Sequence, residues 1–103
     1  MGTAAMTEIE QLQQAIRDLH GFKSSHHKSV VVNEMYHGSP LWNGTVEVFQ
    51  IHGHPRAGFA YAWSYEDDEH RPQYVAVLGI APVNSAEDAV RAYVVADTVR
   101  KSK

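Results

Sequence analysis

Residues 57–65 read Ala57-Gly58-Phe59-Ala60-Tyr61-Ala62-Trp63-Ser64-Tyr65. Large aromatic side chains occupy every second position from residue 59 onwards, and small residues fill the positions between them. Side chains alternate between the two faces of a β-strand, whereas a helix would scatter the rings around its circumference. The stretch therefore predicts a strand with its aromatic rings on one face and only small residues on the other.

Helices are expected on both sides of the strand region. Apolar residues recur at helical spacing over residues 8–20, between a Thr7–Glu10 capping box and Gly21, and this pattern is typical of a complete helix with both caps. Ser85 and Asp88 have the capping spacing that predicts a second helix over residues 86–100. Residues 1–6 are expected to form a flexible tail, and residues 7–101 a single domain.

Three further strands are predicted from β-branched and apolar runs, over residues 29–36, 45–52 and 73–81. Turn chemistry is expected at residues 37–40, at Asn43-Gly44 and at residues 53–56. Connections of this length make neighbouring strands antiparallel. The predicted fold is α+β in the order α-β-β-β-β-α, a four-stranded antiparallel meander with the two helices packed on one face.

The pairing register decides which sheet face is the core. A regular hairpin at residues 53–56 places Gln50 opposite Phe59 and Val48 opposite Tyr61, and we expect the aromatic face to lie under the alanine-rich second helix. A bulge would reverse this choice. The other face is too apolar for solvent, so a second copy of the chain is expected to cover it, with a ligand as the alternative. The predicted interface residues are Phe49, Ile51, Gly58, Ala60 and Ala62.

The amino-acid composition excludes several classes of chemistry. The chain has 103 residues, a net charge of −3 and no cysteine, which excludes disulfides, thiolate catalysis and cysteine-ligated zinc and favours a reducing, cytoplasmic location. No apolar run is long enough to span a membrane. His52 and His54 could share a metal, but no established metal motif supports this, and neither a metal nor a cofactor is expected.

Four residues are the candidates for ligand binding in a pocket between the sheet and the helices: Trp42, Glu47, Tyr61 and Trp63. A carboxylate near an apolar pocket could act as a general base, but the favoured interpretation is that Glu47 faces solvent or pairs with Arg56 or Arg71. The rings could also stack on bases, but the acidic run at residues 66–69 would repel phosphate.

The leading functional hypothesis is a small binding or interaction domain that forms a homodimer through the apolar sheet face or the second helix. The first alternative is a small-molecule-binding protein or an enzyme, and the sequence favours binding over turnover because it has no recognised catalytic motif. The second alternative is a weak single-stranded nucleic-acid binder.

One resemblance covers roughly residues 40–95. The segments Trp42–Phe49, Gly53-His54-Pro55, Tyr61-Ala62-Trp63 and Val75–Leu78 resemble short uncharacterised bacterial proteins of the mobile-gene-cassette kind. This likeness implies a small bacterial domain that stands alone, and it transfers no catalytic residue.

Overall fold

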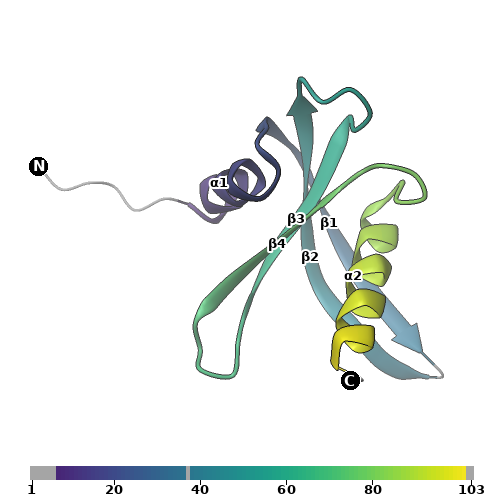
Figure 1. Ribbon diagram of the computed structural model, residues 1–103. Coiled ribbons are helices and arrows are strands. Elements are labelled where there is room, and N and C mark those ends of the chain that lie inside the picture. Colours follow the sequence, from purple (N-terminus) through teal and green to yellow (C-terminus); the bar gives the residue numbers. More distant parts are fainter. Residues whose placement is uncertain (1–6, 37, 102–103) are drawn as a thin grey trace, which may run out of the picture.

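Six elements make up the protein, and the computed structural model describes residues 7–36 and 38–101. In chain order they are α1 (Glu8–His20), β1 (Lys23–Tyr36), β2 (Ser39–His52), β3 (Phe59–Glu66), β4 (Pro72–Leu78) and α2 (Ala86–Lys101). The strands form one antiparallel sheet in the order β1-β2-β3-β4, so the predicted α+β meander is confirmed (Figure 1). The expected tail at residues 1–6 lies outside the described residues.

The first helix has the ends that its sequence predicts. The Thr7 side chain accepts a hydrogen bond from the N–H of Glu10 (3.2 Å), and the Glu10 carboxylate accepts one from the N–H of Thr7 (2.9 Å). Gly21 takes the left-handed conformation with φ 82°, which costs glycine little because it has no Cβ. Both caps satisfy backbone groups that a helix end leaves unpaired.

Both strands of the first hairpin are longer than predicted. The polar residues 23–28 belong to β1, which pairs with β2 from Lys23↔His52 to Tyr36↔Ser39. The turn predicted at Asn43-Gly44 is wrong, because both residues lie inside β2, opposite Asn33 and Val32. A Cβ on Gly44 would lie 3.0 Å from Cη2 of Trp42, so glycine here makes room for an indole ring and does not mark a turn.

The predicted register between β2 and β3 is confirmed, with Val48 opposite Tyr61 and Gln50 opposite Phe59. Pairing between these strands covers only residues 47–50 and 59–62, whereas β3 pairs with β4 along residues 60–66. Beyond Glu47 and Ala62 the two hairpins therefore separate, and they form the crossed arms in Figure 1.

The acidic run forms the exposed tip of the β3–β4 hairpin, as predicted. Asp67 Oδ1 accepts hydrogen bonds from the N–H groups of Glu69 (2.8 Å) and Arg71 (2.9 Å), and Asp67 Oδ2 bonds Arg71 Nε at 3.0 Å. These donors, above all the backbone N–H of Arg71, hold the pKa of Asp67 below its ordinary value of 3.8. The charges at this tip thus fix its turn.

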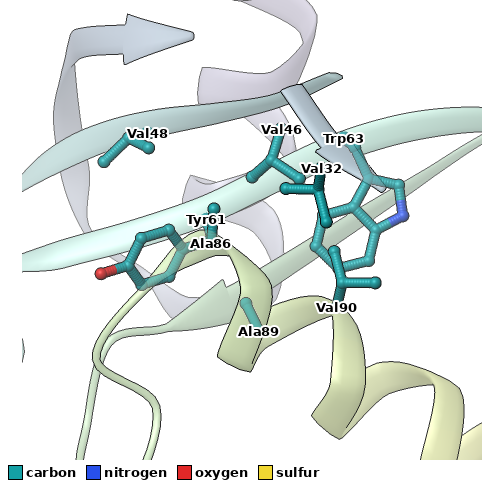
Figure 2. Close-up of a cluster of buried hydrophobic side chains, with 8 residues drawn as sticks. All are labelled: Val32, Val46, Val48, Tyr61, Trp63, Ala86, Ala89 and Val90. Atoms are coloured by element: carbon teal, nitrogen blue, oxygen red, sulfur yellow. The ribbon is translucent and has the colours of Figure 1, made fainter. Parts of the chain in front are cut away.

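The two helices pack on opposite faces of the sheet (Figure 1), and the prediction that both lie on one face is wrong. Leu12 and Ile16 of α1 fill the small-residue face, in a cluster completed by Phe49, Ile51, Ala60 and Ala62. The small Ala86 and Ala89 of α2 fit the aromatic face, in a cluster completed by Val32, Val46, Val48, Tyr61, Trp63 and Val90 (Figure 2). On one face Leu12 and Ile16 pack against the small Ala60 and Ala62, and on the other the small Ala86 and Ala89 pack against Tyr61 and Trp63, so the sizes of the facing side chains are complementary.

This arrangement corrects the predicted interface. Phe49, Ile51, Ala60 and Ala62 are buried within the single chain by α1, so they are not available to a second copy. Gly58 alone of the predicted set is exposed, in the loop before β3. Over the described residues, no helix is both long and apolar enough to cross a membrane.

Candidate ligand-binding site

The predicted ligand residues divide between the two sheet faces. Trp42, Tyr61 and Trp63 lie on the face covered by α2, whereas Glu47 lies one residue out of phase with Val46 and Val48 and faces the other way. The structure therefore brings the three aromatic residues together and places the carboxylate apart from them.

Trp63 is a core residue. Its side chain is 2% exposed, and its ring meets the rings of Trp42 and Tyr93 edge-on, with both centroid distances 5.5 Å. The indole Nε1 is buried and has no hydrogen-bond partner among the described residues. Such enclosure by rings is typical of packing, and Trp63 is not accessible to a ligand.

Glu47 is satisfied by its own neighbours on β1. Its Oε1 lies 2.8 Å from His26 Nε2 and accepts a hydrogen bond from Ser29 Oγ at 2.5 Å. The ring of His26 also packs against Phe49, with centroids 5.4 Å apart. The partners of Glu47 are therefore His26 and Ser29, whereas the sequence offered Arg56 or Arg71. Sequence reasoning missed this cluster because residues 23–28 were expected to be a connection and not part of β1.

The two histidines that the sequence suggests as a metal pair, His52 and His54, each have hydrogen-bond partners. His52 Nε2 lies 2.7 Å from Ser25 Oγ, and His54 Nδ1 accepts the N–H groups of Arg56 and Ala57, both at 2.9 Å. His54 therefore builds the turn between β2 and β3. Among residues 7–36 and 38–101, no three His, Cys, Asp or Glu side chains are grouped closely enough to hold a metal ion.

A pocket of about 430 Å³ opens between the sheet and the beginning of α2. Its apolar surface comes from Val30, Val48, Phe59 and Ala86, and its polar groups come from His27, Lys28, Tyr61, Asn84, Ser85 and Glu87. Of the four predicted ligand residues, only Tyr61 lines it. The volume is in the range of roughly 300–1,000 Å³ that is usual for small-molecule sites.

An irregularity in β1 supplies one wall of this pocket. The β1–β2 register shifts between His26 and Lys28, so His27 has no direct partner in β2. A bulge of this kind redirects side chains at a strand edge. Here the His27 ring packs against Phe59, with centroids 5.3 Å apart, and His27 and Lys28 both line the pocket.

The N-terminus of α2 supplies the opposite wall. Ser85 Oγ accepts the N–H of Asp88 (3.1 Å), as the capping pattern predicts, and Asp88 Oδ2 accepts the N–H of Asn84 (3.1 Å). The first N–H groups of a helix have no partner within it. Ala86 and Glu87, the first two residues of α2, line the pocket.

Tyr61 connects the core to the pocket. Its side chain is 7% exposed, and its hydroxyl has no hydrogen-bond partner among the described residues. Figure 2 shows this hydroxyl on the side of the ring away from Trp63. Burial, with a smaller contribution from the Asp88 carboxylate, raises the pKa of Tyr61 above its ordinary value of 10.0. The phenol is therefore protonated at neutral pH and can donate a hydrogen bond.

A second hollow of about 400 Å³ lies between α1 and β4. Its polar side chains already bond one another: Tyr74 Oη donates to Gln11 (3.2 Å), and Gln14 donates to Asp18 (2.9 Å). Because these groups need no ligand, the pocket beside Tyr61 is the better candidate site.

A scan against protein-family models, a search of curated proteins and a search of solved structures each found no match.

Proposed function

We propose that this protein is a small-molecule-binding domain whose ligand occupies the pocket between the sheet and the N-terminus of α2. The observation that carries the proposal is Tyr61, a residue that is 7% exposed, lines the pocket and has a hydroxyl group without a hydrogen-bond partner among the described residues. A hydrogen bond that replaces one to water contributes about 0.5–1.5 kcal/mol. A ligand that accepts a hydrogen bond from this hydroxyl would gain that free energy.

The pocket favours a small flat molecule. Phe59 and Tyr61 offer ring surfaces, and Val30, Val48 and Ala86 complete an apolar lining. Polar side chains surround this apolar surface, so a ligand can be held by burial of its apolar part and oriented by hydrogen bonds. The proposal includes a cytoplasmic location, which the absence of cysteine supports.

The test is an NMR titration of the ¹⁵N-labelled protein with benzamide and benzoate, which share one phenyl ring. We expect either probe to shift the amide resonances of Phe59, Tyr61 and Ala86 in a saturable way, and to leave those of Gln14 and Leu19 on α1 in place. Tyr61→Phe is the matched variant. It removes only an unpartnered hydroxyl, so it should retain the wild-type melting temperature and weaken binding. If neither probe shifts the pocket resonances at millimolar concentration, the proposal is wrong.

A second candidate is self-association through the outer face of α2. Val95 is 62% exposed, and it lines a shallow apolar groove with Pro82, Val83, Ala92 and Ala96, beside Asp88 and Arg91. A two-fold axis along this groove would bring the opposite charges of two copies together. Light scattering after size exclusion should then show a dimer that Val95→Glu converts to a monomer. A wild-type monomer at 100 μM would dismiss this candidate.

A further inference from the structure

We infer that the ligand of this pocket carries a negatively charged group, most simply a carboxylate, attached to a small aromatic or aliphatic body. The inference rests on the proposed function and adds the charge of the ligand to it. It is drawn from three features that line the pocket: the Lys28 ammonium, the Tyr61 hydroxyl and the beginning of α2.

The donors come from two elements. The first N–H groups of α2 lie at the positive end of its helix dipole, where an anion is stabilised by about 0.3–1 kcal/mol at an exposed site. On the sheet side, the Tyr61 hydroxyl is kept protonated and lacks an acceptor among the described residues. A carboxylate between them can accept from both, whereas the Ser85 side chain already serves as the helix cap.

The bulge in β1 adds positive charge. Lys28 carries a full charge, and His27 beside it can donate from its ring. In a regular strand these consecutive residues would face opposite sides of the sheet. The register shift between His26 and Lys28 removes that restriction and allows both to line the same pocket.

The carboxylates of Asp88 and Glu87 would repel an anionic ligand, and the repulsion from Asp88 should be the weaker of the two. Asp88 is offset by Arg91, whose Nη1 lies 3.2 Å from Asp88 Oδ1, and by the N–H of Asn84 on its other oxygen. Glu87 lines the pocket itself and forms no ion pair among the described residues. Glu87 should therefore weaken the binding of an anion, and its removal should strengthen it.

The test compares benzoate, benzamide and benzylamine, which share a phenyl ring and carry a negative charge, no charge and a positive charge. Dissociation constants are measured by the same NMR titration at 50 mM salt. We expect benzoate to bind about 5- to 10-fold more tightly than benzamide, as one charge-assisted hydrogen bond allows. Benzylamine should bind most weakly.

Three variants test which charged residues cause the preference for benzoate over benzamide. Lys28→Gln should weaken benzoate binding about two- to fivefold and leave benzamide unchanged, because it removes one exposed charge. Glu87→Gln should tighten benzoate binding by a similar factor. Glu69→Gln, at the distant hairpin tip, is the matched control and should change neither.

The possible failures are distinct. Benzamide or benzylamine binding as tightly as benzoate would overturn the inferred charge and leave the proposed pocket intact. Benzoate binding that responds to neither Lys28→Gln nor Glu87→Gln would also overturn it. Failure of all three probes to shift the pocket resonances would overturn the proposed function, and this inference with it.

Discussion

Replacing Trp63 with alanine tests the central claim that this ring is core and not binding surface. Trp63 follows Ala62, the last residue of β3 that pairs with β2, and its ring contacts those of Trp42 and Tyr93. Removing a buried tryptophan costs about 3–5 kcal/mol, because transfer free energy is lost and the cavity does not collapse completely. A domain of this size is stable by about 5–15 kcal/mol. The variant should therefore lose a large part of its free energy of unfolding.

Urea unfolding followed by far-UV circular dichroism measures this loss without relying on the fluorescence of the deleted indole. Tyr65→Ala is the matched control, since Tyr65 lies two residues along the same strand on the same face but is 43% exposed. We expect a decrease of about 3 kcal/mol or more for Trp63→Ala and of about 1 kcal/mol or less for Tyr65→Ala. Equal and small effects would refute the assignment of Trp63 to the core.

Three further predictions address other parts of the molecule. Thr7→Ala removes the acceptor of the capping box and should lower the free energy of unfolding by about 1 kcal/mol in the same urea assay; an unchanged midpoint would contradict the cap. Because the pKa of Asp67 is lowered in the folded state, its contribution to stability is present above the ordinary value of 3.8 and is lost as pH falls through the folded-state pKa. Asp67→Asn should flatten that part of a plot of melting temperature against pH, and an identical plot would refute the effect. Ile16→Glu places a charge beneath α1 and should expose the apolar sheet face, seen as increased binding of the dye ANS, whereas Leu19→Glu, at a position that is 59% exposed, should not; equal dye binding would contradict the position of α1.

The element order could be predicted because its signals are local. The caps of α1, the alternation in β3 and the charged hairpin tip each depend on residues within a few positions of one another. The same applies to the β2–β3 register, which the short loop after His52 and the hydrophobic pattern specify together.

The prediction failed where contacts between residues that are distant in the sequence determine the structure. Asn43-Gly44 is a strong turn signal, yet pairing with Asn33 and Val32 along β1 overrides it. The polar residues 23–28 form a strand because β2 offers them a backbone partner. The position of α1 could not be derived from periodicity, which shows that the helix has an apolar stripe but not which sheet face the stripe meets. The sizes of the facing side chains were the usable signal, since Leu12 and Ile16 complement Ala60 and Ala62.

The alternation in β3 places the Tyr61 and Trp63 rings next to each other on one face, yet only Tyr61 borders the pocket. Tyr61 and Trp63 both pack against α2, but they meet different parts of it. Trp63 lies against Tyr93, well inside the helix, and other rings enclose it. Tyr61 lies beside Ala86, the first residue of α2, and both residues line the pocket. A position under the middle of a helix is closed by packing, and a position under its N-terminus borders unpaired donors. The pocket therefore lies where it does because α2 begins beside Tyr61 on β3. If α2 began one turn later in the chain, the pocket should be larger, and the first N–H groups of the helix should no longer border it.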